Sequence, residues 1–461
     1  MKKFLLFGAG AGALAVLAGC DIQFSDSSHV WSTADLMTAT NVVRTAAIPA
    51  GLKALDVDNR FGTIHITGTD SGPTSWTWNL AVHARSDAVA QKIADAASCK
   101  AELDGDHLRL IVSLPESREP HSIQSDFEIR LPKAVSVRAE NRFGPIDVSD
   151  LAGNVEAIDA NGRVKILNVG GSVQARTSFD SLSVNKTGPA TLKNQNGEIR
   201  AADIGGSLEA ETSFDSLIVR EVRGQAALDN QNGRIEASAV HGSLEAKTSF
   251  ESLVATDISG AATLHNQNGR IEAAGIGGSL DANTSFDSLV AHNVSGPVHL
   301  RDQNGRIKIA GAKGDADIET SFDSLNAEGI QGDAVLVNQN GSVVASGITG
   351  SVKASTSFAT MDITGAGPRF VCHNQCGAIR LRATSTDVSN IEANTSFDTL
   401  QVQLPGSLKP AIQAHTTFGE VESDFPVLMK PRGEEAFADV APGTARITLQ
   451  NQNGKIGVVR E

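Results

Sequence analysis

Residues 266–301 have the sequence NQNGRIEAAGIGGSLDANTSFDSLVAHNVSGPVHLR, which divides into two 18-residue halves that align without a gap. The first half begins with Asn266-Gln267-Asn268-Gly269, and the second begins with Thr284-Ser285-Phe286-Asp287. Each half recurs at intervals of 36 residues, as shown by Gly197, Gly233, Gly269, Gly305, Gly341 and Gly377 and by Phe214, Phe250, Phe286, Phe322 and Phe358. A fixed period of this size predicts a stacked repeat.

The pattern within each half predicts short β-strands. Ile271 and Ala273 alternate with polar neighbours, and so do Leu280 and Ala282, which is the two-residue period of a half-buried strand. We expect the Asn-Gly and Gly-Gly pairs before these strands to supply corners with positive φ. A coil of 18 residues with two or three short strands is one turn of a β-solenoid. The sequence therefore predicts an all-β, single-stranded solenoid built from 36-residue double repeats.

The number of repeats predicts a rod. Coils stack through backbone hydrogen bonds at roughly 4.8 Å, so the about fifteen coils after Asn141 would span on the order of 70 Å. The handedness of parallel crossover connections favours a right-handed coil.

Length and charge narrow the classes of function. A chain of 461 residues exceeds one compact core, but a repeat array grows without splitting into domains. The net charge is −14, and removal of Lys2 and Lys3 with a leader leaves 37 basic against 53 acidic residues, a charge of −16. Nucleic acid and anionic lipid surfaces would both repel such a protein, so neither is expected as a partner.

The N-terminus resembles a bacterial lipoprotein signal. Lys2 and Lys3 precede an apolar run, which ends in Leu17-Ala18-Gly19-Cys20. The resemblance implies cleavage after residue 19 and attachment of acyl chains, palmitate among them, at Cys20. The alternatives are a plain secretory leader and a membrane-spanning helix, but the run is short and Gly-rich for a span. By resemblance to lipoprotein sorting in enterobacteria, Asp21 implies the periplasmic face of the inner membrane over the outer membrane. Residues 20–40 are expected to form the lipidated cysteine and a polar tether.

Residues 41–140 do not repeat, and we expect them to cap the first coil. Asn59-Arg60-Phe61-Gly62 is an early copy of the corner motif. A short helix is expected after Ser86, a hairpin at Asp104-Gly105, and a strand at residues 127–131. Such a region would cover backbone groups that otherwise invite edge pairing.

Residues 141–404 carry the repeats, and residues 405–461 are predicted to close the rod. The segment from Pro405 to Gly443 is rich in proline and leads to a last corner motif at Asn451-Gln452-Asn453-Gly454. We interpret the proline-rich segment as an excursion that allows this final rung to close the C-terminal end.

This order of parts resembles the bacterial β-strand-repeat family of unknown function whose members are named putative adhesins. The likeness rests on the leader, the corner motif, the helix-containing insert, the ladder of Asn-Gly corners and the closing rung. It covers the chain from about Leu52 to Val459. The strict alternation of Asn-Gln-Asn-Gly with Thr-Ser-Phe-Asp departs from the family's more uniform repeats. The resemblance implies a β-solenoid in the cell envelope and assigns no catalytic residue.

Three rows of residues are candidate binding surfaces. The Asn row is interpreted as a set of corner residues that tolerate a left-handed conformation next to Gly. The Phe row would stack on a ligand such as a sugar if it faces outward, but we expect it to be buried or packed in the corner, since a recurring apolar position usually marks the core. The acidic row is interpreted as a solvated face, because carboxylates two coils apart cannot share a calcium ion. The rows are Asn196, Asn232, Asn268, Asn304 and Asn340; Phe179, Phe214, Phe250, Phe286, Phe322, Phe358 and Phe397; and Asp180, Asp215, Glu251, Asp287, Asp323 and Asp398.

No catalytic, metal or cofactor site is predicted. A carbohydrate-active enzyme on a β-helix needs a non-repeating cluster of carboxylates with Lys or Arg, and no such cluster interrupts the repeats. His241, His265, His292 and His299 lie at unlike positions of their coils, so they form no common metal site.

The cysteines after Cys20 leave two alternatives open. Cys372 and Cys376 straddle one corner, and they either form a short-loop disulfide or remain two packed thiols. Cys99 has no evident partner.

The sequence as a whole favours a non-catalytic, lipid-anchored envelope rod that acts as an adhesin-like binding or scaffold module. Its partners would be the membrane, through the lipid, and an envelope glycan or protein bound through many weak, equivalent contacts. The alternative is a structural spacer or sensing component without its own ligand. A carbohydrate-active enzyme is the least favoured class.

Overall fold

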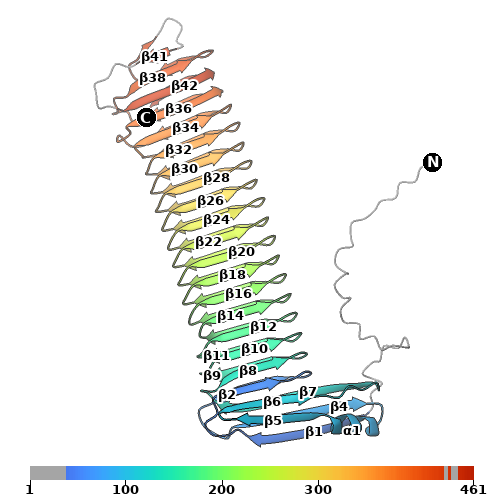
Figure 1. Cartoon of the computed structure of the whole chain (residues 1–461). Coiled ribbons are helices and arrows are strands. Elements are labelled where there is room, and N and C mark those ends of the chain that lie inside the picture. Colours follow the sequence, from blue (N-terminus) through green and yellow to red (C-terminus); the bar gives the residue numbers. More distant parts are fainter. Residues whose placement is uncertain (1–37, 430–434, 438–444) are drawn as a thin grey trace, which may run out of the picture.

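The computed structural model describes residues 38–429, 435–437 and 445–461, and these residues form a long rod with a wider N-terminal cap (Figure 1). The predicted leader, Cys20 and most of the tether lie outside the described residues. The prediction of an all-β solenoid is confirmed. Each 18-residue coil contains two strands, one in each of two parallel sheets that face each other across the core.

Sheet A contains the second strand of each coil. Its strands in the repeats are β9 Ile146–Leu151, β11 Val164–Val169, β13 Leu182–Thr187, β15 Ile199–Ile204, β17 Leu217–Val222, β19 Ile235–Val240, β21 Leu253–Ile258, β23 Ile271–Ile276, β25 Leu289–Val294, β27 Ile307–Ala312, β29 Leu325–Ile330, β31 Val343–Ile348, β33 Met361–Gly365, β35 Ile379–Ala383 and β37 Leu400–Leu404.

Sheet B contains the first strand of each coil. Its strands in the repeats are β8 Ser136–Asn141, β10 Val155–Asp159, β12 Val173–Thr177, β14 Ala190–Asn194, β16 Leu208–Thr212, β18 Ala226–Asn230, β20 Leu244–Thr248, β22 Ala262–Asn266, β24 Leu280–Thr284, β26 Val298–Asp302, β28 Ala316–Thr320, β30 Ala334–Asn338, β32 Val352–Thr356, β34 Arg369–Asn374 and β36 Asn390–Phe397.

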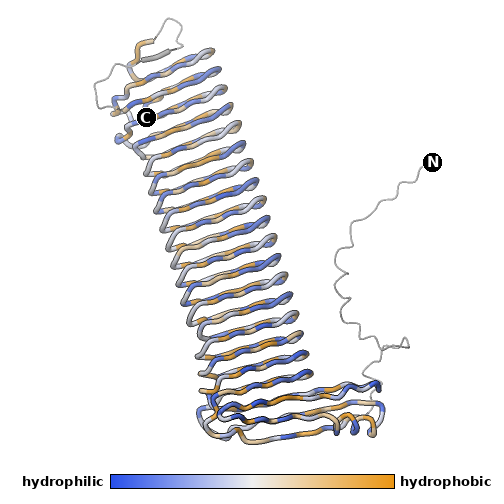
Figure 2. Tube along the Cα trace, viewed as in Figure 1, coloured by the Kyte–Doolittle hydropathy of each residue, from blue (hydrophilic) through white to orange (hydrophobic). Residues whose placement is uncertain are grey.

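The core is a narrow layer of aliphatic side chains between the two sheets. Ile271 and Ala273 of β23 point inward with Leu280 and Ala282 of β24, and all four are essentially inaccessible to solvent. The parallel register pairs each core residue with its equivalent one coil later, as in Ile271 with Leu289. Figure 2 shows the resulting alternation of apolar and polar residues along every strand. Stacked coils therefore bury a continuous core, worth roughly 1.5–3 kcal/mol for each large aliphatic side chain.

The prediction of positive φ at the Asn-Gly and Gly-Gly corners is wrong. Positive φ occurs instead at the fifth residue of many sheet A strands, for example Asp257 (55°), Gly275 (69°) and Asn293 (54°). The kink at this place lets the next residue, such as Ile276, turn back into the core. Asp, Asn and Gly adopt this conformation at the lowest cost and fill most of these positions, while Lys186, Glu221 and Ala239 adopt it as well.

The corner glycines are needed because of close approach. A Cβ atom on Gly269 would overlap the backbone carbonyl oxygens of Phe250 and Glu251 in the preceding coil. The equivalent Gly233 and Gly305 approach the carbonyl oxygens of Asp215 and Asp287 in the same way. These glycines therefore set how tightly one corner stacks on the next.

The N-terminal cap extends the first coil, which consists of β2 (Ala54–Asp58) and β3 (Ile64–Thr69), with an insertion of longer strands. In sheet A the order is β1 (Thr38–Ala47), β4 (Ser75–Ala84), β7 (His121–Pro132), β3; in sheet B it is β5 (Ser98–Asp104), β6 (His107–Ser113), β2. The expected helix is α1 (Asp87–Ala96), and the expected hairpin joins β5 to β6, with φ of 61° at Gly105. The first rung is thus covered by parallel pairing with β6 and β7, and antiparallel pairing begins only with β5 and β4 beyond them.

The C-terminal rungs do not stack in sequence order. β42 (Arg446–Asn453) lies between β36 and β38 (Ala411–Thr416), and β43 (Ile456–Arg460) lies between β37 and β39 (Val421–Ser423). The short strands β40 (Leu428–Met429) and β41 (Glu435–Phe437) follow, with β41 paired to β38. The prediction that the last corner motif closes the rod is therefore wrong, because this rung is inserted beneath the one that precedes it in sequence.

We predict that Gly269→Ala lowers the stability of the rod by about 2–4 kcal/mol, because the added methyl group forces two corners apart. The midpoint of urea denaturation, followed by circular dichroism, measures this change. Gly457→Ala is the matched control, because the nearest atom to its Cβ would be Gln401 Cγ at 4.0 Å. Equal midpoints for the two variants would contradict this account of the corner.

Candidate functional site

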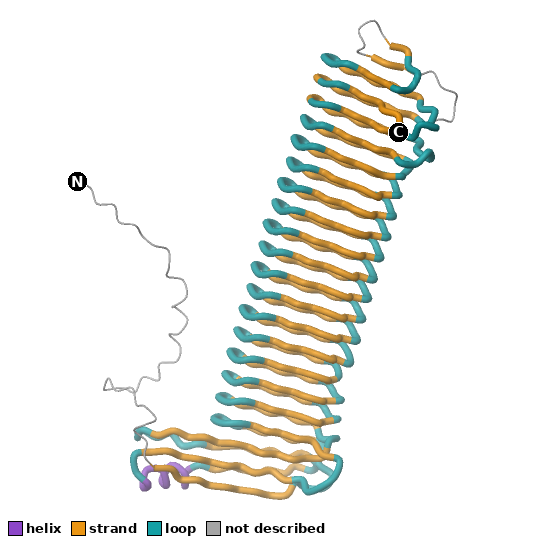
Figure 3. Tube along the Cα trace, turned by 180° about the vertical axis from the view of Figure 1, so that it is seen from behind, coloured by secondary structure: helices purple, strands orange, loops and turns teal. Residues whose placement is uncertain are grey.

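The loops that follow the sheet B strands stack along one long edge of the rod, the left edge in Figure 3. Each loop has four equivalent positions, which are Thr-Ser-Phe-Asp in one type of coil and Asn-Gln-Asn-Gly in the other. We call the outer surface of these loops the aromatic edge. It is defined by the third position, which carries Phe61, Phe143, Phe179, Phe214, Phe250, Phe286, Phe322, Phe358, Phe397 and Phe418.

The first position of each loop is buried and holds the corners together. Thr284 Oγ1 donates a hydrogen bond of 2.8 Å to the carbonyl oxygen of Gly269 in the preceding coil. Asn266 Nδ2 donates one of 2.6 Å to the carbonyl oxygen of Glu251, and Asn266 Oδ1 accepts from the N–H of Gly269 at 2.9 Å. On alternate coils, Thr and Asn therefore both donate a hydrogen bond from a buried side chain to a carbonyl oxygen of the preceding coil. The sequence reasoning missed this ladder, although its period was visible.

The third position points outward, so the expectation that the Phe row is buried is wrong. The six rings from Phe179 to Phe358 are 59–64% exposed. The corner is already filled by the first-position Thr or Asn, and the backbone then turns so that the third side chain leaves the core. The rings of alternate coils lie roughly 9.6 Å apart along the edge.

Asn at the third position shows that the fold does not require Phe there. Asn268 Nδ2 donates to the carbonyl oxygen of Ser249 at 3.1 Å, and Asn304 Nδ2 donates to that of Ser285 at 2.9 Å. Asn thus adds a hydrogen bond between coils, so the Asn row is structural, although through this bond and not through a left-handed backbone. Because the Asn side chain bends back toward the rod, the edge alternates projecting rings with low positions.

The alternation of Phe and a smaller residue continues through the displaced C-terminal rungs. In sequence, Phe397 is followed by Phe418 and then by Asn453. In space, the rung with Asn453 lies between the other two, and Asn453 Nδ2 donates to the carbonyl oxygen of Ser396 at 3.2 Å. The insertion of the last rung therefore preserves the pattern of the edge.

Charges also alternate along the aromatic edge. An acidic residue follows most of the Phe residues, and it is exposed, as in Asp215, Glu251 and Asp287. An Arg follows the Gly of several intervening corners, as in Arg234 and Arg270. Each of these rings therefore has an acidic residue in its own corner and an Arg in the corner of an adjacent coil.

Two adjacent coils at the N-terminal end both carry Phe, and their rings stack. The centroids of Phe61 and Phe143 are 5.3 Å apart and the ring planes differ by 8°. Rings on neighbouring coils thus reach the separation preferred by aromatic pairs, roughly 4.5–7 Å. Beyond Phe143, every second ring position is occupied by a smaller residue.

Two corners have Asp in place of the buried Asn. Asp159 Oδ1 accepts from the N–H of Gly162 and Asp302 Oδ1 from that of Gly305, each at 2.9 Å, but neither Oδ2 has a hydrogen-bond partner. Each Oδ2 occupies the place where Asn would donate to a carbonyl oxygen, and only a protonated carboxyl can donate there. Burial raises the pKa of Asp302, and burial raises the pKa of Asp159 to about 6.

We predict that Asp159→Asn stabilises the rod by about 1–2 kcal/mol at pH 8 and has little effect near pH 4. The ionised carboxylate cannot donate a hydrogen bond to the carbonyl oxygen that it faces, whereas the protonated carboxyl and the Asn amide can. The folded-state pKa is raised, so the stabilising contribution of Asp159 is full below its usual pKa of 3.8 and is lost as pH rises through about 6. Urea denaturation midpoints at the two pH values measure the change. A pH-independent difference would contradict the assignment.

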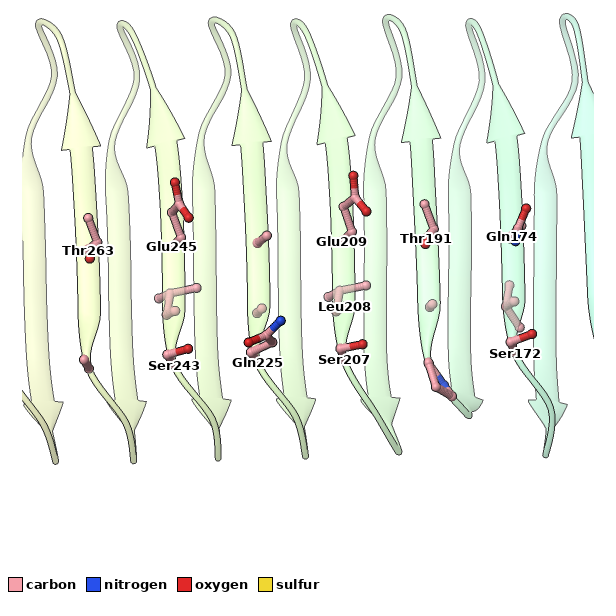
Figure 4. Close-up of a pocket in the computed structure, with 17 residues that line it drawn as sticks. Ser172, Gln174, Thr191, Ser207, Leu208, Glu209, Gln225, Ser243, Glu245 and Thr263 are labelled. Carbon is pink, nitrogen blue, oxygen red and sulfur yellow. The ribbon is translucent and has the colours of Figure 1, made fainter.

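Shallow depressions lie on the faces of the described part of the rod. One of them lies on the outer face of sheet B, where Gln174, Thr191, Glu209 and Glu245 project from the strands (Figure 4). In the described part of the chain, no three His, Cys, Asp or Glu side chains are grouped as metal ligands, and no helix is long and apolar enough to cross a membrane.

The three cysteines in the described ranges are free thiols. Cys372 on β34 is buried in the core, and this burial raises its pKa to about 12. Cys376 occupies the third position of the following corner and is half-buried. Of the two alternatives for this pair, the structure has the unpaired thiols. Cys99 is also buried, and burial raises its pKa to about 11.

No family model and no curated protein matches the chain. Among solved structures, it is similar to a putative cell adhesion protein from Clostridium sporogenes ATCC 15579, with 8% identity, 92% of this chain and 100% of that chain covered, and a TM-score of 0.18. It is also similar to a putative adhesin from Bacteroides fragilis NCTC 9343, with 11% identity, 74% of this chain and 97% of that chain covered, and a TM-score of 0.14. Likenesses at these scores carry no argument about function.

Proposed function

We propose that this protein is a non-catalytic rod of the bacterial cell envelope, held by lipid at Cys20, and that its aromatic edge is an adhesin-like binding or scaffold surface. The observation that carries the proposal is the row of exposed Phe side chains on one edge. Large apolar side chains gathered on a surface are typical of interaction sites.

The Asn coils supply the strongest support. Asn fills the third position on alternate coils and forms a hydrogen bond to the preceding coil, whereas Phe at the same position leaves most of its ring in water. A spacer without a ligand would need only the Asn form of the corner. The repeated Phe therefore has a role other than folding.

The regular spacing supports binding by avidity. Each ring with its acidic neighbour is a small, equivalent contact, and the contacts repeat roughly every 9.6 Å. A single exposed ring binds weakly, but many rings on one rigid rod engage a repetitive partner together.

Retention of the soluble chain, residues 21–461, on isolated cell envelopes tests the proposal; this chain keeps every described residue. We expect the triple variant Phe250→Ala, Phe286→Ala, Phe322→Ala to lose retention by at least roughly tenfold, because each truncation removes an aromatic contact. The assay is sedimentation with envelopes from cells that carry the protein and from cells that lack it.

A matched control changes three exposed apolar residues away from the edge. Leu167, Val335 and Val344 are 40%, 36% and 41% exposed on the sheet faces, and their triple Ala variant should be retained like the unchanged chain. Circular dichroism confirms that both variants fold. Equal retention of the Phe variant and the unchanged chain on both kinds of envelope would overturn the proposal.

The anchor is tested separately. We predict that Cys20→Ser moves the full chain from the membrane fraction to the soluble fraction of cells, because the acyl chains supply the membrane affinity. Metabolic labelling with a palmitate analogue should mark the unchanged chain and leave the variant unmarked. Labelling of the Cys20→Ser chain would contradict lipid attachment at this residue.

A further inference from the structure

We propose that the partner of the aromatic edge is the same edge of a second copy of this chain, paired antiparallel so that the Phe rings of the two rods interdigitate. This inference rests on the proposed function, since it names the partner of that surface. Four features support it: the vacant ring positions, the shape of the cap, the pattern of charges and the area available.

The space along the rod between two successive Phe rings, over each Asn corner, is wide enough for one further ring. Successive rings on one rod are two coils apart, roughly 9.6 Å, so a ring inserted midway lies about 4.8 Å from each neighbour. Phe61 and Phe143 show that rings one coil apart stack at this edge, with centroids at 5.3 Å. A partner's Phe over each low Asn position would extend the same stacking along the rod.

Two rods related by a two-fold axis are either parallel or antiparallel. The positions of the rings and the shape of the cap both favour the antiparallel pair. In a parallel pair related by a two-fold axis along the rod, Phe would meet Phe at the same height instead of meeting Asn. Residues 121–124 of β7 precede the part of the strand that pairs with β3, and the cap projects past the edge (Figure 1). Two caps at the same end would hold parallel edges apart, whereas in an antiparallel pair each cap lies beside the partner's C-terminal end.

One register aligns the repeats over the full length of both rods. A two-fold axis perpendicular to the rods, passing between the corners of Asn268 and Phe286, places a Phe of each rod opposite a smaller residue of the other at every rung from Phe143 to Asn453. Only at the two ends does one ring, Phe61, face another, Phe418. The facing pairs are Phe286 with Asn268, Phe250 with Asn304, Phe322 with Asn232, Phe214 with Asn340, Phe358 with Asn196, Phe179 with Cys376, Phe397 with Asn161 and Phe143 with Asn453.

The charges agree with this register. The axis keeps sheet A of both rods on the same side, so the acid directly after a Phe lies near the Arg that stands two positions after the facing Asn. Arg234 then lies beside Asp323, Arg270 beside Asp287, Arg306 beside Glu251 and Arg163 beside Asp398. These contacts would add to ion pairs that the Arg side chains form within their own rods, which are Arg163 with Asp147, Arg234 with Glu236, Arg270 with Glu272 and Arg306 with Asp323. Glu198 is the one acid at an Arg position in the repeats, and it faces Ala359, which is the one replacement of an acid after Phe179–Phe397.

Neighbouring registers are less favourable. A shift of two coils in either direction, which keeps Phe opposite Asn, brings Glu198 opposite Asp323 or Asp398. Like charges brought together at an interface are repulsive, so the charges single out the register with full overlap.

The area is adequate for a stable pair. Fully burying an aromatic side chain removes roughly 150–250 Å² from solvent. The six rings from Phe179 to Phe358 are about 60% exposed, so twelve rings from two rods bury on the order of 1,200 Å² before other atoms are counted. Stable interfaces bury roughly 1,200–2,000 Å².

The antiparallel arrangement also explains how such a pair would act at an envelope. The N-terminal caps lie at opposite ends of the pair, so lipid anchors attached through the two N-termini would enter two facing membrane surfaces. Rods on one membrane have the same polarity and would not pair in this way.

The decisive experiment is a charge reversal with rescue across the pair, read as molar mass by sedimentation equilibrium of residues 21–461. We expect the unchanged chain to form a dimer and Arg234→Glu to weaken it by roughly ten- to thirtyfold, because two ion pairs become two repulsions. Asp323→Arg alone should weaken the dimer similarly, and the double variant should restore it. These residues lie five coils apart in one rod, too far for an interaction within the chain to cause the rescue.

A matched double variant tests the register. Arg234→Glu with Asp287→Arg would be complementary only in the register shifted by two coils, so we expect no rescue. The Phe250→Ala, Phe286→Ala, Phe322→Ala variant should be monomeric and folded, while the control variant at Leu167, Val335 and Val344 should remain dimeric. Rescue by Asp287→Arg instead of Asp323→Arg would overturn the proposed register.

The outcomes also separate this inference from the proposed function. If the unchanged chain is monomeric and its Phe-dependent retention is equal on envelopes with and without the protein, self-pairing is wrong and a foreign ligand occupies the edge. If retention is Phe-dependent only on envelopes that carry the protein, both proposals stand. If the chain is monomeric and no retention depends on Phe, both are wrong.

Discussion

The structure depends on the hydrogen bond between the buried first residue of each corner and a carbonyl oxygen of the preceding coil. Within a corner of the repeats the backbone bonds between coils reach only its first carbonyl oxygens, such as those of Thr248 and Ser249. The carbonyl oxygens of Glu251 and Gly269 need side-chain donors instead. Thr284 and Asn266 supply these donors from side chains of different size. The absence of a Cβ on Gly269 lets the corners approach closely enough for these bonds.

This arrangement separates folding from surface chemistry within four residues. The first position holds the coils together, and the third position is free to carry a residue chosen for the surface. Asn at the third position adds a bond to the rod, while Phe exposes a ring without disturbing the stack. The corners of Asp159 and Asp302 show how strict the inner position is, because an acceptor there leaves a buried oxygen without a partner.

The two ends of the rod show how the pattern is protected. At the N-terminal end β7 pairs with β3 of the first rung in parallel, and β4 and β1 continue the sheet beyond β7 in antiparallel fashion. At the C-terminal end the rung of Asn453 is inserted between those of Phe397 and Phe418. Without this insertion the corners of Phe397 and Phe418, which both begin with Thr, would be adjacent. The alternation of Thr and Asn at the first position, and of Phe and a smaller residue at the third, would then be interrupted.

The sequence by itself determined the coil length, the two-residue alternation of the strands, the inward aliphatic residues and the helix and hairpin of the cap. These features are local or strictly periodic, so residues such as Ile271 and Leu289 reveal them by spacing alone. Only the tertiary structure decided that Phe286 points outward, that positive φ falls at Gly275 and its equivalents, and that the last rung is inserted. Periodicity cannot show the direction of a side chain at a corner, because the backbone turns there and the strand rule no longer applies. The order of the C-terminal rungs depends on pairing between distant segments. The break in the alternation between Phe397 and Phe418 marks the place in the sequence, but it does not show which segment is inserted there.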